Sequence, residues 1–491
     1  MQTDDGSLVR SLLKSGLVVS SGQVIGYALS FVRNVIFARF LTKTDYGLVA
    51  ALWVTVSLFE LVNRMGIRNQ VVQAKEGDDP RFQATGQSMQ ALGGALSGAI
   101  ILVCSCSMAK VFGAPEFAWA FALISLVPLF RGMMHLDIAR FQRQLNFTPG
   151  VLVDVIPQAI SLAAALPLLA WLGGLQAILV IILGKEFLTL AMSHKVASWN
   201  YKLGWDRSYV KRIIYFSWPL VLTGVVMFAS QQGDRMVVGS ALSLSDLASY
   251  SIAVEISSIP FLIFGSVLGS LLLPILSRSQ DNDEEFLDLY TKALIASVVG
   301  SLVILSPLMI GGGVIIRLVY GAKYSGLGTL MAILGGVVAL RFFRLAPSTA
   351  SMSKADTVNQ LVSNIARSVS LPLALAAVAL GSKEITLIAA CGLVGELLAI
   401  SVAVWRAHTR QGIPISMHLK PFAFLIFWIG GSWVLQWLTE GKSELLVVLG
   451  LFLLLSLFGA LAVFLFREVR YALNYVILQN RYKAIDWLRL W

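Results

Sequence analysis

The sequence predicts an all-α polytopic membrane protein, and three observations support this fold class. Of its 491 residues, 57% are hydrophobic and only 13% are charged, and the mean hydropathy is +0.77. An ordinary soluble domain has about a quarter of its residues charged. Apolar runs of roughly 20 residues, the length that crosses a ~30 Å hydrocarbon layer, recur from one end of the chain to the other.

Apolar runs bounded by charged residues or Gly/Pro clusters predict about fourteen transmembrane helices. The first run follows two aspartates and lacks a small-residue cleavage site, so we expect a retained span rather than a signal peptide. The predicted spans are residues 16–38, 46–66, 86–109, 117–137, 149–171, 175–194, 213–241, 247–276, 290–310, 326–345, 357–380, 384–405, 421–438 and 443–466. The basic, aromatic segment 467–491 predicts either an interfacial helix or a stop-transfer tail.

The charges of the short loops predict the orientation. About two dozen Lys and Arg residues fall on one side and seven on the other, and the richer side of such proteins faces the cytoplasm. Both termini are therefore predicted to be cytoplasmic. The net charge of +11 is carried largely by these loops, which lie next to anionic lipid headgroups. The charge therefore does not indicate binding to nucleic acid. No loop is long enough to fold as a catalytic domain. The sequence also shows no motif with the residue spacing of a cofactor site, a zinc site or a catalytic site.

An internal repeat predicts two pseudo-symmetric six-helix lobes with a C-terminal helix pair. "LTKTDYG" at Leu41 is echoed by "LSLSDLASY" at Leu242, about 201 residues later. "VFGAPE" at Val111 is echoed by "VYGAKY" at Val319, and Arg131 by Arg341, with offsets of about 208 and 210. The predicted parts are residues 1–207, 208–412, 413–466 for the extra pair, and the tail 467–491. An even number of spans per half gives the parallel repeat plan of many transporters.

Ionisable side chains inside the predicted spans are the candidate functional groups. A central Arg, Lys or Asp costs about 2.5 to 3.5 kcal/mol on insertion, so these side chains must face a wet cavity or a partner. One interpretation is structural ion pairing, for instance between Arg131 and Glu60. The other is a pathway for an anionic substrate, since arginine suits phosphate and carboxylate recognition. The set comprises Arg33, Glu60, Arg131, Lys185, Glu186, Asp234, Arg235, Glu255, Arg341, Arg344, Arg367 and Glu396.

Several loose motifs give the chain a family resemblance. They are "FARFLTKTDYGLVA" at Phe37, "FQRQLNF" at Phe141, "GDRMVVG" at Gly233 followed by "LASYSIA", and "VYGAKY" at Val319. Together they resemble the oligosaccharide flippase family of polysaccharide biosynthesis proteins. That family belongs to the multidrug/oligosaccharidyl-lipid/polysaccharide exporter superfamily.

The resemblance implies a flippase of a bacterial inner membrane. It would move an undecaprenyl-pyrophosphate-linked oligosaccharide from the cytoplasmic to the periplasmic leaflet, through a cationic cavity between two lobes, and would not be an enzyme. Membrane lipids, H⁺ or Na⁺ as coupling ion, and the polymerase and export machinery are the implied partners. The implied substrate-binding residues are Arg33, Arg131, Arg235, Arg341 and Arg367, and the implied ion-coupling residues are Glu60, Asp234 and Glu255.

Three other functions stay open at this point. A multidrug or organic-cation antiporter of the same superfamily is expected to carry mainly carboxylates in its first lobe, where this chain has Arg33 and Arg131. A membrane-embedded polysaccharide polymerase or ligase is expected to have a large outward loop. A passive scaffold of the export apparatus would not need charges at mid-depth.

Overall fold

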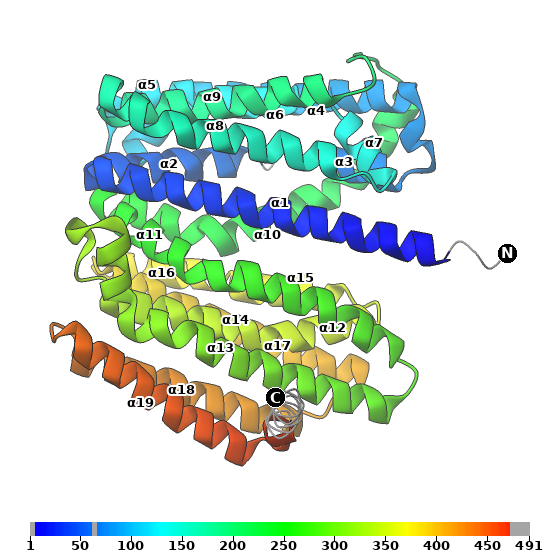
Figure 1. The fold of residues 1–491 in the computed structure, drawn as a ribbon. Coiled ribbons are helices and arrows are strands. Elements are labelled where there is room, and N and C mark those ends of the chain that lie inside the picture. Colours follow the sequence, from blue (N-terminus) through cyan, green and yellow to red (C-terminus); the bar gives the residue numbers. More distant parts are fainter. Residues whose placement is uncertain (1–4, 61–65, 472–491) are drawn as a thin grey trace, which may run out of the picture. The chain divides into compact units, whose positions relative to one another are not determined.

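The computed structural model describes residues 5–60 and 66–471, with side chains from residue 21 onward, and this part of the chain contains helices and no strand (Figure 1). Eleven of the described helical segments are long and apolar enough to cross a membrane. They become twelve if the bent pair Pro115–Gly132 and Asp137–Arg143 is one span. Helices at Asp5–Phe40 and Lys43–Phe59 overlap the first two predicted spans, and residues 61–65 of the second span lie outside the described residues. Each predicted span therefore overlaps described helix. The predicted all-α membrane fold is confirmed.

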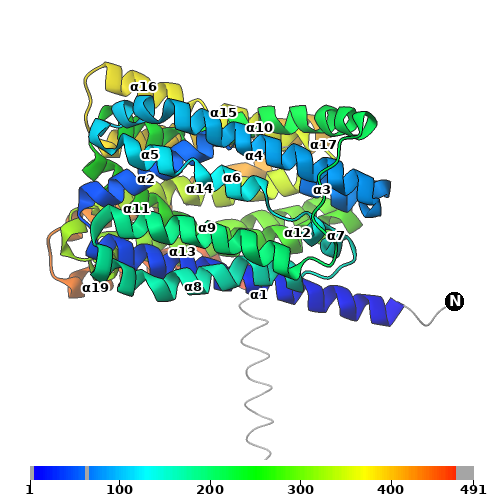
Figure 2. The ribbon, with the colours of Figure 1, turned by 90° about the horizontal axis from the view of Figure 1, so that it is seen from above.

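By its internal packing the chain divides into two units, Met1–Ser251 and Ile252–Trp491. In the first unit, α8 packs against both α1 and α9, and α4 packs against α5 and α6 (Figures 1 and 2). The helices of this unit are α1 (Asp5–Phe40), α2 (Lys43–Phe59), α3 (Ile67–Gln73), η1 (Lys75–Asp78), α4 (Pro80–Val111), η2 (Pro115–Phe117), α5 (Ala118–Leu123), α6 (Leu126–Gly132), α7 (Asp137–Arg143), α8 (Thr148–Leu172), α9 (Gly174–Val196) and α10 (Arg207–Ala241). The helix α11 (Leu244–Pro260) contains the boundary between the units.

In the second unit, α14 packs between α13 and α17, while α15 and α16 lie against α17. The C-terminal pair α18 and α19 packs on α13, where the indole nitrogen of Trp428 donates to Ser306 Oγ at 3.0 Å. The helices of this unit are η3, a π-helical turn (Phe261–Gly265), α12 (Ser266–Arg278), α13 (Asp283–Tyr320), η4 (Ala322–Tyr324), α14 (Gly328–Ser353), α15 (Val358–Arg367), α16 (Ser370–Ala379), α17 (Ile385–Gln411), α18 (Ser416–Thr439) and α19 (Glu444–Leu465).

The repeat that the sequence predicted reappears in the helix caps. Thr42 accepts the Asp45 backbone N–H at 3.1 Å and donates its hydroxyl to the Asp45 carboxylate at 2.6 Å. Ser243 makes the same two bonds to Asp246, at 3.1 and 2.6 Å. Each hydroxyl satisfies a backbone donor in the first turn of a helix. The two echoes are therefore equivalent starts of α2 and α11.

One predicted span, residues 117–137, is broken rather than continuous. The α6 helix ends at Gly132, whose backbone touches that of Gly94 in α4: a Cβ on Gly94 would lie 2.7 Å from Gly132 Cα. The amide nitrogen of Gln90 then donates to the carbonyls of Arg131, Gly132 and Met134 at 3.1 to 3.2 Å. Orphaned carbonyls at a helix end need such partners, so α4 both stops α6 and fixes the backbone of Arg131.

Some predictions are not tested by this architecture. The lobe limits 1–207 and 208–412 stay a prediction, as does the cytoplasmic placement of both termini. Of the predicted basic tail, residues 472–491 lie outside the described residues.

Candidate functional site

In the first unit, Arg131 is the centre of an ion-pair network. Its Nη1 lies 2.7 Å from Glu60 Oε2, and its Nη2 lies 2.7 Å from Glu186 Oε1. Lys185 Nζ lies 3.0 Å from the same Glu186 oxygen. The Arg131 guanidinium also sits over the Trp53 ring, with 5.7 Å between Cζ and the ring centroid. The pair of Arg131 with Glu60 that the sequence suggested is present, and Glu186 makes it a network.

Three segments bring these charges together. Glu60 is the C-cap residue of α2, Arg131 ends α6 beside Gly132, and Glu186 lies in α9 with 1% of its side chain exposed. Arg131 is 29% exposed and Lys185 is 18% exposed. The network therefore has a buried carboxylate on one side and solvent-accessible cations on the other.

In the second unit, three arginines share one carboxylate. Glu396 of α17 is 1% exposed and accepts from Arg341 Nε at 3.0 Å and from Arg344 Nε at 3.3 Å. Arg367 Nε, at the end of α15, lies 2.8 Å from Glu396 Oε1. The Arg344 Nη1 also donates to Asn364 Oδ1 at 3.3 Å. We call Arg341, Arg344, Arg367 and Glu396 the arginine cluster.

The two networks occupy equivalent places in the repeat. Glu186 follows Arg131 by 55 residues, and Glu396 follows Arg341 by the same 55 residues. The aromatic partner recurs as well, since Arg341 Cζ lies 5.5 Å from the Phe261 ring centroid. Phe261 opens the π-helical turn η3. The same arginine, glutamate and aromatic group thus occur in both halves.

The charges of the two networks differ. Arg131 and Lys185 face Glu60 and Glu186, so these four side chains sum to zero. The arginine cluster has three cations around one carboxylate and a net charge of +2. Among the described residues, Glu396 is the carboxylate that Arg341 and Arg344 share, and cations inside a membrane protein are costly without a full counter-charge. An anion would therefore be stabilised at the arginine cluster more than at the Arg131 network.

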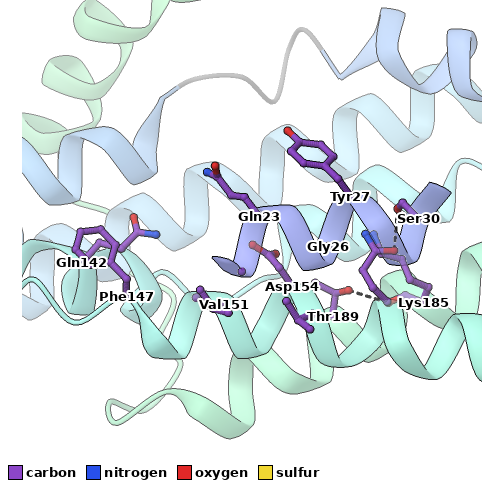
Figure 3. A pocket seen from close by; sticks show the side chains of 14 residues that line it. Gln23, Gly26, Tyr27, Ser30, Gln142, Phe147, Val151, Asp154, Lys185 and Thr189 are labelled. Carbon is purple, nitrogen blue, oxygen red and sulfur yellow. Dashed lines mark hydrogen bonds between the residues drawn. The ribbon is translucent and has the colours of Figure 1, made fainter. Parts of the chain in front are cut away.

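Two neighbouring cavities open beside the Arg131 network. The larger has a volume of about 620 Å³ and its charged lining residues are Arg68, Arg131, Lys185, Asp154 and Glu186. The smaller, of about 350 Å³, lies between α1 and α8 (Figure 3). Both cavities are lined by Gly150, Asp154, Lys185 and Thr189. The two cavities therefore adjoin along α8 and α9.

Arg33 lies next to the smaller cavity. Its Nη1 donates to Gln158 Oε1 at 3.1 Å and to Ser161 Oγ at 2.9 Å, so α1 is tied to α8 by neutral acceptors. The guanidinium also lies 5.9 Å from the Phe37 ring centroid.

The remaining predicted site residues lie on α10 and α11. Asp234 and Arg235 are in α10, where Asp234 accepts from the Tyr250 hydroxyl at 2.7 Å and Arg235 Nη1 donates to Gln232 at 2.9 Å. Glu255 is half-buried in α11. The roles of these residues in substrate binding and ion coupling stay predictions.

Four members of the networks were seen in the sequence as intramembrane charges but not selected as site residues: Lys185, Glu186, Arg344 and Glu396. The repeat offset of 210 residues, which relates Arg131 to Arg341, also relates Glu186 to Glu396 and would have identified both carboxylates. Asp154 was missed entirely because it lies near the start of a predicted span, where an interfacial carboxylate is ordinary.

Comparison with known proteins identifies the family. Residues 36–329, more than half of the chain, match the polysaccharide biosynthesis protein family. The chain belongs to this family. The succinoglycan biosynthesis transport protein ExoT of Rhizobium meliloti (strain 1021) is 25% identical to it over 290 residues. That match spans 58% of this chain and 57% of ExoT, little more than half of each protein.

Several solved structures share the fold of this polysaccharide biosynthesis protein. The lipid II flippase MurJ in its inward closed conformation matches with a TM-score of 0.68 at 14% identity, over 91% of this chain and 99% of MurJ. An inward-facing MATE family multidrug resistance transporter of the MOP superfamily gives 0.62 at 13% identity, over 80% and 96%. A MOP superfamily transporter from Pyrococcus furiosus Vc1 (DSM3638) gives 0.55 at 14%, over 83% and 96%. The superfamily fold implied by the sequence motifs is confirmed.

Proposed function

We propose that this protein is a flippase for undecaprenyl-pyrophosphate-linked oligosaccharides in a bacterial inner membrane. It moves its substrate from the cytoplasmic to the periplasmic leaflet by alternating access, during exopolysaccharide, capsule or O-antigen biosynthesis. Membership of the polysaccharide biosynthesis family, the transport role in the name of ExoT and the MurJ-like fold support this proposal. The observation that carries it is the arginine cluster with its net charge of +2.

The chemistry of the arginine cluster suits a diphosphate. Arg341 and Arg344 are 18% and 9% exposed, so they are largely shielded from the water that would otherwise stabilise their charge. Guanidinium groups present paired N–H donors to phosphate oxygens. Glu396 orients the three arginines through their Nε atoms. The two terminal nitrogens of Arg341 then remain for a ligand. A diphosphate headgroup would add the negative charge that Glu396 alone cannot supply to both Arg341 and Arg344.

The other predicted residues have narrower roles in this proposal. Arg131 is neutralised by two carboxylates, so it binds an anion only when it exchanges Glu60 or Glu186 for the substrate. Arg33 positions the amide of Gln158. Arg235 is a further substrate contact, and Glu60, Asp234 and Glu255 are the candidates for H⁺ or Na⁺ coupling.

The charge of the arginine cluster argues against the main rival function. An organic-cation antiporter would place a cationic substrate beside three guanidinium groups around one carboxylate, and like charges in a low-dielectric site repel strongly. A drug antiporter of this fold should instead present excess carboxylates. The polymerase or ligase alternative lacks support from the described loops, which join neighbouring helices through short segments.

A flipping assay in proteoliposomes tests the proposal. The probe is undecaprenyl pyrophosphate carrying a labelled oligosaccharide, and its leaflet is read by cleavage with a membrane-impermeant glycosidase. The test variant is Arg341→Gln with Arg344→Gln, which leaves Arg367 paired with Glu396 and so brings the arginine cluster to zero charge. The matched control is Arg317→Gln, an exposed arginine of the same unit that pairs with Glu444.

We expect wild type and the Arg317 control to flip the probe at equal rates, and the double variant to be at least about tenfold slower, the effect of roughly 1.4 kcal/mol of lost interaction. Full activity in the double variant would reject the role of the arginine cluster. Absence of flipping by wild type, with a folded protein in the membrane, would reject the proposed function itself.

A further inference from the structure

The smaller cavity of the first unit is lined mainly by amides, hydroxyls and two aromatic rings rather than by charges. Its lining includes three glutamines, from α1, α7 and α8, together with one carboxylate and one ammonium group. Figure 3 shows the lining side chains of α1 and α8, including Gln23, Tyr27 and Asp154. Such a lining is close to neutral overall and rich in both donors and acceptors.

Several of these polar groups have no partner within the described part of the chain. Gln23, Tyr27, Gln142 and Asp154 make no hydrogen bond or ion pair to residues 21–60 or 66–471, and all four line the cavity. Polar groups in a protein cavity are normally satisfied by water or by a ligand. These side chains are therefore available to an occupant without breaking an existing contact.

Gln158 is oriented so that its donor is available as well. Its Oε1 accepts from Arg33 Nη1 at 3.1 Å and from Ser30 Oγ at 3.0 Å. Because a guanidinium can only donate, the amide oxygen must face Arg33. The amide nitrogen is then left as a donor at the cavity. Arg33 acts here as a positioning residue, which accounts for its place inside an apolar span.

We infer that this cavity holds one neutral hexose ring of the lipid-linked saccharide. Sugar hydroxyls both donate and accept, as the amide side chains do, and the aromatic side chains of Tyr27 and Phe147 add apolar area to the lining. A volume of about 350 Å³ is at the small end of ligand cavities, which suits a single ring. The inference rests on the proposed function, which supplies the saccharide.

Gly26 gives a way to fill the cavity without disturbing its walls. A Cβ added to Gly26 would meet nothing within 4 Å, and Gly26 lines the cavity. Its neighbour Gly22 differs, because a Cβ there would lie 2.6 Å from Val151 and would push α1 from α8. Gly184 in α9 also has open space at its Cβ but does not line this cavity. Gly26→Leu is therefore the test variant, and Gly184→Leu is its matched control.

The experiment compares two probes on the purified full-length protein. One probe is undecaprenyl pyrophosphate, and the other is the same lipid carrying a single hexose, tested as the glucosyl and the galactosyl form. Native mass spectrometry measures both affinities for wild type, Gly26→Leu, Gly184→Leu and Gln23→Leu. The last variant removes one cavity-lining amide at nearly constant side-chain size, and the Gln23 side chain has no partner among the described residues.

We expect wild type and the Gly184 control to bind one hexosyl lipid about tenfold more tightly than the bare lipid, as two neutral hydrogen bonds would give. Gly26→Leu should bind both probes equally and keep the wild-type affinity for the bare lipid. Gln23→Leu should reduce the hexose preference.

Three results would separately overturn the proposed function, the hexose site and its location in this cavity. A wild type that binds neither probe would overturn the proposed function. A wild type that binds the bare lipid but shows no preference for either hexosyl lipid would overturn the hexose site alone. A preference that survives in Gly26→Leu would place the sugar elsewhere.

Discussion

The substitution Glu396→Gln is predicted to destabilise the second unit severely. It removes the carboxylate shared by Arg341, Arg344 and Arg367, and these guanidinium groups are only 9% to 18% exposed. Removing one partner of a buried ion pair typically costs about 3 to 5 kcal/mol, because the other charge stays buried without compensation. The 1% exposure of Glu396 means that solvent screening does not reduce this estimate. For a unit of this size, the loss corresponds to a Tm lower by about 6 to 20 °C.

The equivalent substitution in the first unit, Glu186→Gln, is the matched comparison. Arg131 keeps Glu60 at 2.7 Å, and Lys185 faces a cavity that can hold water, so less charge is left unpaired. We expect a loss of about 1.5 to 2 kcal/mol, at the lower end of the range for hydrogen bonds to charged groups. Thermal unfolding of both variants in detergent, followed by intrinsic tryptophan fluorescence, measures the difference. Equal Tm losses, or a wild-type Tm for Glu396→Gln, would refute the argument from charge balance.

Two further predictions concern packing and pH. Gly47→Ala should lower the stability by about 1 to 3 kcal/mol, because the added Cβ would lie 1.8 Å from a backbone carbonyl oxygen at the start of α11. Gly26→Ala is the control: its added Cβ would meet nothing within 4 Å, so the Tm should not fall. Burial raises the pKa of the Asp356 carboxyl, but hydrogen bonds from Gln411 and a backbone N–H, with the Arg406 charge, outweigh this effect and hold it below the ordinary 3.8. Asp356 therefore contributes stability above about pH 3.8 that is lost as the pH falls toward its lower folded-state pKa. Asp356→Asn should reduce the drop in Tm between pH 6 and pH 3; an unchanged drop would contradict this assignment.

The sequence predicted the helices well because each apolar run has to cross the same thickness of hydrocarbon. It also paired Arg131 with Arg341 through the repeat, and the structure gives both the same kind of partner, a glutamate 55 residues later. Sequence patterns within a span could not reveal these partners. The contact between α6 and α9, and between α14 and α17, is made only when the helices pack.

The break at the end of α6 and the cavity along α8 were beyond the sequence for related reasons. The break depends on Gly94 meeting Gly132 and on Gln90 reaching three carbonyls, which are contacts between separate helices. The importance of Asp154 follows from its lack of a partner among the described residues, which no local pattern records.

We propose that the positive charge of the arginine cluster holds an anionic headgroup. The most direct test is the affinity of the purified protein for undecaprenyl pyrophosphate without sugar, measured for Arg341→Gln with Arg344→Gln and for Arg131→Gln. We predict that the double variant binds at least about tenfold more weakly than wild type, while Arg131→Gln, taken from a network of zero net charge, binds nearly as wild type does. Unchanged binding by the double variant would contradict the account.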